Sequence, residues 1–173
     1  SDAAVEALFK KAGIVRCNSR LELAYVAGVM QYKELTGKNI AIVTHAGGPG
    51  VMLTDILSDE GMEVPHIEGE KADALLEKLF HGSSVANPID FLATGTAEQL
   101  GDILDAIDGF DNIDGSVVIF GTPGIFDVTP AYKVLDEKIK TCKKPIFPCL
   151  PSPVLAGDAV ETFKELGRNY MED

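Results

Sequence analysis

The chain has 173 residues, of which 46% are hydrophobic and 24% charged, and these are the proportions of a folded globular protein. It carries 27 acidic against 15 basic residues, so its formal net charge is −12. Such an acidic chain repels a nucleic-acid backbone, and no apolar run reaches the ~20 residues of a membrane helix. We therefore expect neither a nucleic-acid nor a membrane partner. Small anions stay possible, because backbone N–H groups bind phosphate without a cationic side chain.

Three scattered cysteines, Cys17, Cys142 and Cys149, form no CxxC pair. An odd, scattered set supports neither a disulfide framework nor a zinc site. Reduced thiols are typical of the cytoplasm, which is the location we expect. The chain starts abruptly at Ser1 with a helical pattern and without a basic-then-apolar leader, so we interpret it as a segment of a longer protein.

The first 37 residues predict a helix–strand–helix appendage. Residues 2–12 have helical apolar spacing, 14–17 form a short strand-type run, and 21–35 have the pattern of a long helix. Asn18-Ser19 offers an N-cap for the second helix, and glycines follow both helical stretches. Because these elements cannot complete a layer alone, we predict a boundary between residues 1–37 and 38–173.

Strands and helices alternate from Lys38 onward. The expected strands are 40–43, 62–67, 87–91, 116–120 and 145–150, and the expected helices are 51–57 with its extension to Gly61, 71–80, 97–107, 131–142 and 156–166. Residues 40–43 are continuously apolar, as in a parallel sheet buried on both faces, whereas Pro88 disfavours a central position for 87–91.

Five strand–helix units predict an α/β fold with a five-stranded, doubly wound parallel sheet, for which the flavodoxin-like order 2-1-3-4-5 is the natural choice. Ligands of such sheets bind beyond the carboxyl ends of the strands. The turns that leave the first, third and fourth expected strands should converge there.

The strongest functional signal is the turn Thr44-His45-Ala46-Gly47-Gly48-Pro49-Gly50, which joins the first strand to its helix. Glycines allow positive φ and close approach of a ligand, and Pro49 suits a first helical turn. A helix N-terminus adds free N–H donors and roughly half a positive charge. The turn therefore predicts an anion site. It matches neither a Walker A motif nor a GxGxxG fingerprint, and a plain tight turn is the alternative.

His45 either makes a hydrogen bond within the turn or contacts a phosphate, or even accepts one. Two interpretations are open for Asn87-Pro88-Ile89-Asp90. In the first, the Asp90 carboxylate accepts N–H bonds from the glycine turn or orients a ligand. In the second, it caps the next helix, and Asn87 and Pro88 only shape the loop. Gly121-Thr122-Pro123-Gly124 is more typical of an ordinary turn. No ligand cluster for a metal and no catalytic triad is recognisable.

These motifs, taken together, resemble the NDP-forming acyl-CoA synthetases, which include ADP-forming acetate–CoA ligase and have the succinyl-CoA synthetases as relatives. The resemblance rests on residues 40–51, Asp55 and 87–90, and it extends upstream through 2–4, 9–16 and 21–23. It implies that residues 1–37 lead out of a preceding ligase domain. Residues 38–173 would form a succinyl-CoA synthetase-like flavodoxin domain.

The resemblance also implies a reaction, acyl-CoA + NDP + phosphate ⇌ carboxylate + CoA + NTP, which proceeds through an acyl phosphate and a phosphohistidine. Helix N-termini from two flavodoxin-like domains hold that phosphate. The residues expected to bind it here are Thr44, His45, Gly47, Gly48 and Gly50, with Asn87 and Asp90 in support. The complete enzyme would use CoA and ATP or ADP with Mg²⁺, through CoA-binding and ATP-grasp domains or subunits that these residues do not include.

Two departures from the family's motifs limit which residue roles can be transferred to this chain. The phosphorylated histidine of the family lies in a Ser-His-Thr-Gly-type motif that we expect before Ser1, and relatives usually have Asn where this chain has His45. We therefore predict no catalytic residue in the chain, and expect it to be inactive alone and to bind no cofactor strongly. Two alternatives stay open: a ligand-sensing, ligase-like domain of a protein acetyltransferase, and a flavodoxin-like FMN protein.

Overall fold

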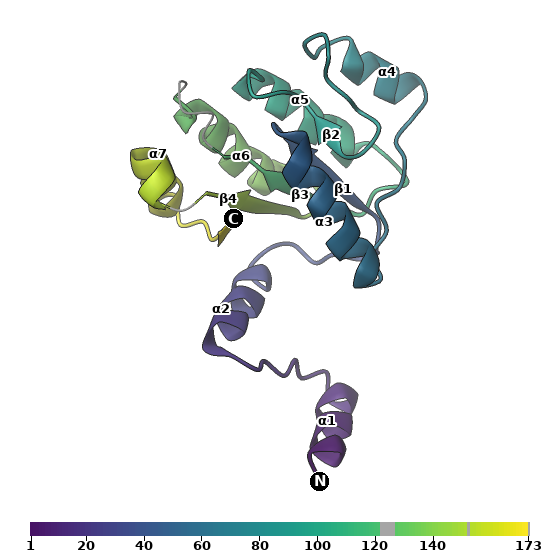
Figure 1. The fold of residues 1–173 in the computed structure, drawn as a ribbon, viewed down its shortest axis with the longest axis vertical. Coiled ribbons are helices and arrows are strands. Elements are labelled where there is room, and N and C mark those ends of the chain that lie inside the picture. Colours follow the sequence, from purple (N-terminus) through teal and green to yellow (C-terminus); the bar gives the residue numbers. More distant parts are fainter. Residues whose placement is uncertain (122–126, 152, 173) are drawn as a thin grey trace. The chain divides into compact units, whose positions relative to one another are not determined.

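A computed structural model describes residues 1–121, 127–151 and 153–172, with only the backbone described at 153–156 and 172. The chain divides into two compact units, Ser1–Gln31 and Tyr32–Asp173 (Figure 1). Within the described residues, every helix is too short or too polar to cross a membrane.

The first unit holds two helices, α1 (Asp2–Lys11) and α2 (Arg20–Val29), neither of which has a buried residue. Both predicted helices are confirmed, but α2 ends at Val29 and does not reach residue 35. The predicted strand at 14–17 is wrong: these residues pair with no strand in the described parts of the chain. An isolated apolar run has no sheet to join in a unit without a core.

The second unit contains a parallel sheet in the order β2-β1-β3-β4-β5. Its strands are β1 (Ile40–Thr44), β2 (Ile89–Asp90), β3 (Gly115–Ile119), β4 (Ile146–Leu150) and β5 (Met171–Glu172). The predicted α/β class and parallel sheet are confirmed, and so are four of the predicted strands. The order is the flavodoxin-like one, although the strands that occupy it are not the five predicted.

The strand predicted at 62–67 is wrong. Only Glu63 pairs with the sheet, through a bridge to Asn39. Pro65 lacks the N–H that a strand would use to continue the ladder, so the pairing stops. The outermost position beside β4 is taken by β5, two residues that lie after the last predicted helix.

The described residues of the second unit also form the helices α3 (Gly47–Asp59), α4 (Glu70–Leu76), α5 (Ala97–Asp108), α6 (Thr129–Thr141) and α7 (Pro153–Glu165). Figure 1 shows α3 on one side of the sheet, with α5 and α6 on the other. Alternate residues of β1 explain this arrangement. Ala41 and Val43 pack in the larger core with α4 to α7, whereas Ile40 and Ile42 form a smaller cluster against Leu53 of α3.

Candidate functional site

The turn between β1 and α3 is shaped by the side chain of Thr44. This residue is fully buried, and its hydroxyl donates to the carbonyl of Ala46 at 2.7 Å and accepts from the Ala46 N–H at 3.1 Å. The two bonds fold the chain back at Ala46, where α3 begins. A phosphate-binding role for Thr44 stays a prediction; the two bonds that its hydroxyl makes within the turn position Ala46.

The N-terminus of α3 has no side-chain cap. Ala46 occupies the N-cap position with extended backbone angles (φ −147°, ψ 118°), and its methyl group accepts no hydrogen bond. Gly47 and Gly48 are exposed and belong to the first turn, whose N–H groups have no acceptor within a helix. Pro49 comes next and has no N–H. The donors that the helix presents at this end are therefore the amides of Gly47 and Gly48.

The three glycines of the turn have different structural roles, and none of them has a positive φ. A Cβ on Gly50 would lie 3.1 Å from the Thr44 methyl group and 3.2 Å from Pro88, so Gly50 is required for packing. A Cβ on Gly48 would meet nothing within 4 Å. The expected use of left-handed backbone is wrong, whereas the expected open approach to the backbone is found at Gly48.

Asp90 lies beside this helix N-terminus. β2 pairs with β1 so that Thr44 is opposite Asp90, which brings the two strand ends together as predicted. One carboxylate oxygen of Asp90 accepts the N–H of Leu92 at 3.0 Å, and the other lies 3.2 Å from where a Cβ on Gly47 would be. The carboxylate therefore places a negative charge next to the α3 amides without a hydrogen bond to them.

Asn87 acts on the sheet rather than on the turn. Its side-chain oxygen accepts the N–H of Ile42 at 2.9 Å, and its amide donates to the carbonyls of Ile40 and Pro65, each at 2.9 Å. The side chain thus replaces the strand that ends at Pro65. Asn87 supports the site by holding β1 in place.

His45 lies over the end of β3. Its ring stacks on Phe120, with centroids 5.0 Å apart, and a Cβ on Gly121 would come within 3.3 Å of it. Burial lowers the pKa of His45 below its usual value of 6.5, although the Ile119 carbonyl and the Asp90 carboxylate oppose this shift. The imidazole is therefore neutral near pH 7. Its buried Nδ1 has no hydrogen-bond partner of ordinary geometry among the described residues.

Phe120 is the residue that the sequence analysis missed. It contacts His45, Phe91 and Tyr132, and so links the ends of the strands around the turn. It was assigned only to a strand, and nothing in the apolar run distinguishes it. Of the turn predicted at Gly121-Thr122-Pro123-Gly124, residues 122–124 lie outside the described residues. In the described part of the chain, no group of three His, Cys, Asp or Glu residues could hold a metal ion.

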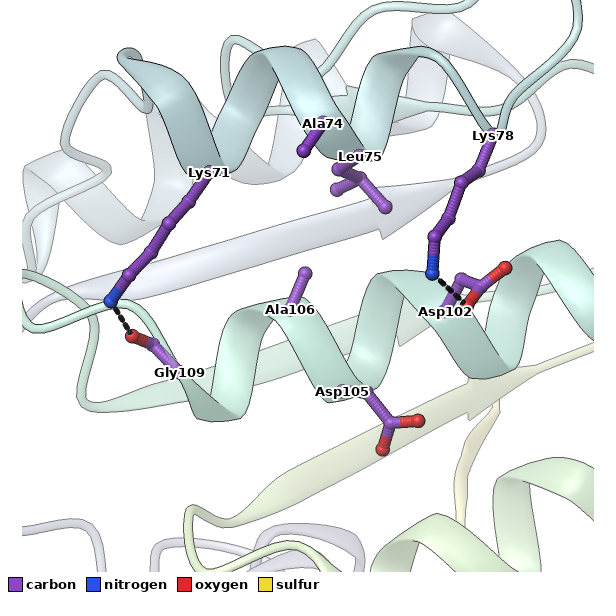
Figure 2. A pocket seen from close by; sticks show the side chains of 8 residues that line it. All are labelled: Lys71, Ala74, Leu75, Lys78, Asp102, Asp105, Ala106 and Gly109. Atoms are coloured by element: carbon purple, nitrogen blue, oxygen red, sulfur yellow. Dashed lines mark hydrogen bonds and ion pairs between the residues drawn. The ribbon is translucent and has the colours of Figure 1, made fainter.

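A separate groove lies between α4 and α5, with Ala74, Leu75 and Ala106 at its floor (Figure 2). One lysine lies at each end of the groove, and both lysines make polar contacts. Lys71 donates to the carbonyl of Gly109 at 2.8 Å, and Lys78 pairs with Asp102 at 2.7 Å. These lysines join the two helices, so we assign the groove a structural role.

No family model matches the chain. It is 28% identical over 125 residues to the α subunit of ADP-forming acetate–CoA ligase II from Pyrococcus furiosus, which is 72% of this chain and 27% of the relative. It is 29% identical over 139 residues to ADP-forming acetate–CoA ligase I from Archaeoglobus fulgidus, which is 80% of this chain and 20% of the relative. The chain therefore spans about a quarter or less of these relatives.

Solved structures share the fold. PH0766 from Pyrococcus horikoshii covers 98% of this chain with a TM-score of 0.87 and 24% identity, and the match takes up 40% of the PH0766 chain. The dinucleotide-forming acetyl-coenzyme A synthetase 1 of Ca. Korarchaeum cryptofilum, in complex with phosphate and ADP, covers 97% of this chain with a TM-score of 0.82 and 20% identity, over 37% of its own length. The sequence relatives confirm the resemblance to NDP-forming acyl-CoA synthetases, and the structures show the common fold.

Proposed function

We propose that this chain is one domain of an ADP-forming acyl-CoA ligase, in which the N-terminus of α3 holds the phosphoryl group that the enzyme transfers. The observation that carries the proposal is the uncapped start of α3, where the Gly47 and Gly48 amides are open to a ligand. Sequence relatives that are ligases of this type support it. A fold neighbour solved with phosphate and ADP is consistent with it.

The site suits a phosphoryl group that a second helix also contacts. Two amides and a helix dipole of roughly half a charge attract an anion, and fixed N–H donors stabilise charge that develops during transfer. Against this, the Asp90 carboxylate lies beside Gly47. The two charges partly cancel, so we expect this turn to hold phosphate weakly by itself and to form half of a cradle.

The remaining parts of the reaction belong to the same proposal. Acyl-CoA, NDP and phosphate would interconvert with carboxylate, CoA and NTP through an acyl phosphate and a phosphohistidine. Other domains or subunits would supply the histidine, the CoA-binding fold and the ATP-grasp fold with its Mg²⁺. Residues 1–37 would connect a preceding domain to the domain at 38–173. We assign the enzyme to the cytoplasm, where its nucleotide and CoA substrates occur.

The test is Gly48→Val in the full-length enzyme, with ATP formation from acetyl-CoA, ADP and phosphate as the readout. A valine side chain would project into the open space above the amides, and we expect at least about a 100-fold loss of activity, comparable to the loss of a key N–H donor. Gly28→Val is the matched control, because Gly28 also lies in a helix with open space around its Cβ position. Full activity of Gly48→Val would refute the phosphate site. Wild-type protein without any ligase activity would instead favour the ligand-sensing alternative.

A further inference from the structure

An open apolar groove of about 350 Å³ runs beside α3, and we call it the α3 groove. Its lining comes from Pro49, Met52, Leu53 and Ile56 of α3, and from Val117, Ile119, Cys149 and Met171 of the sheet. Met52 is 68% exposed and Ile56 57% exposed, which are high values for large apolar side chains.

The groove lies where the sheet has no helical cover. A parallel sheet is normally buried on both faces. The larger core with α4 to α7 fills one face, and α3 is the single helix that the described residues of the second unit place in the smaller cluster on the other. At the opposite end of β4, the ring of Tyr32 lies against that of Phe147, with centroids 5.5 Å apart. Among the described residues of the second unit, no helix covers the surface around Ile119 and Cys149.

The shape of the groove fits a helix. Pro49, Met52 and Ile56 follow one another at helical spacing, so they form a single stripe along the 13 residues of α3. The opposite wall is formed by side chains on the face of the sheet, from Val117, Ile119 and Cys149 to Met171 of the outermost strand β5. A helix packed beside α3 would bury both walls at once.

Charge indicates which helix would bind. Asp55 and Asp59 come three and seven residues after Met52, which places them on the outer side of the stripe, and α3 contains no lysine or arginine. A helix with basic residues beside its apolar stripe would complement this border. A second copy of the same surface would instead bring two acidic rows together.

We propose that the α3 groove binds an amphipathic helix with basic flanks from another segment of the ligase. The source of the helix rests on the proposed function, whereas the binding of such a helix does not. Additional polypeptide is present in the fold neighbours, since the matched part is 40% of the PH0766 chain.

The binding test uses two labelled helical peptides of about 18 residues, five turns, with the same leucine stripe but flanked by lysines in one and glutamates in the other. Fluorescence anisotropy with the 173-residue chain measures their affinities. We expect the lysine peptide to bind more tightly, and Met52→Gln and Ile56→Gln each to weaken it about tenfold. Val51→Gln is the matched control, because Val51 is 59% exposed on α3 but does not line the groove.

Three results would overturn the proposal. One is equal binding of the two peptides, or no binding of either. Another is an equal loss of affinity in Val51→Gln. The third is a wild-type dimer in light scattering that Met52→Gln dissociates, since a second copy would then occupy the groove.

The source of the helix is tested by alkylation of Cys149 in a Cys17→Ser background. Cys149 lines the groove and is partly exposed, whereas Cys142 is buried. We expect iodoacetamide to modify Cys149 about tenfold more slowly in the full-length protein than in the 173-residue chain, because the helix would cover it. Equal rates would show that the ligase does not supply the helix. This outcome is independent of the Gly48→Val activity, so the two proposals can fail separately.

Discussion

The helices α3 and α5 both follow neighbouring strands of the sheet, yet their N-termini are completed in opposite ways. In α5, the Thr96 hydroxyl accepts the N–H of Gln99 at 3.1 Å, and the Gln99 side chain accepts the N–H of Thr96 at 3.0 Å. In α3, the N-cap is Ala46 and no side chain accepts the first amides. In α5, side chains of the capping box accept N–H groups at the helix start, whereas in α3 the first amides have no side-chain acceptor and are open to a ligand.

This difference has a cost in stability. A side-chain cap contributes ~1 kcal/mol, and a glycine within a helix is less favourable than alanine by a similar amount. Gly50 has a packing reason, but Gly48 has open space around it and would tolerate a side chain in the isolated domain. A local choice that lowers helix stability without a packing benefit is typical of functional sites.

Among changes to the caps of these two helices, the largest effect is expected from giving α3 a side-chain cap like that of α5. In Ala46→Asp, the new carboxylate would accept the Gly48 N–H, since the extended backbone of residue 46 suits an N-cap. We expect the free energy of unfolding to rise by about 1 kcal/mol and ligase activity to fall at least about tenfold. Urea denaturation and ATP formation measure the two quantities. A variant that gained stability and kept its activity would show that the open amides are not used.

A smaller effect is expected when the cap of α5 is removed. Thr96→Ala should lower the free energy of unfolding by about 1 kcal/mol, because both bonds of the capping box are lost. Activity should be unchanged at temperatures where the protein stays folded. Thr96→Ser is the control, since its hydroxyl can restore the cap. An activity loss in Thr96→Ala beyond its loss of folded protein would contradict the contrast between the two helices.

The smallest effect concerns pH. Burial lowers the pKa of His45 in the folded state, so the unfolded chain binds a proton at higher pH and stability decreases as the pH falls below about 6.5. His45→Asn should make the free energy of unfolding less dependent on pH between about 5 and 7. An unchanged pH dependence in His45→Asn would show that this ring does not titrate differently on folding.

Sequence patterns predicted the parts of the fold that depend on burial. The continuous apolar runs of β1, β3 and β4 were placed correctly, because most of their residues are buried in the sheet. The run at 62–67 looked similar but contains Pro65, and its place beside β1 is partly taken by a side chain. The spacing of apolar residues does not reveal which polar group makes the remaining backbone hydrogen bonds of a strand.

The candidate site was predicted at the level of the backbone and less well at the level of side chains. The convergence of the strand ends around the glycine turn follows from sheet topology and was predicted. The inward hydrogen bonds of Thr44 and Asn87 were not, because a polar residue near a site can serve either the ligand or the fold. Only the contacts of each side chain separate these two roles. The assignment of phosphate to these residues stays a proposal.

The side chain of Asn87 has a consequence for how the protein behaves in solution. β2 pairs with β1 only at Val43 and Thr44, so the earlier part of the same edge offers an N–H at Ile42 and a carbonyl at Ile40, and a bare edge of this kind can pair with a strand from another molecule. Asn87 occupies both groups. A single amide thus protects the most apolar strand of the sheet from edge-to-edge aggregation, in a place where a proline prevents the chain from supplying a strand of its own.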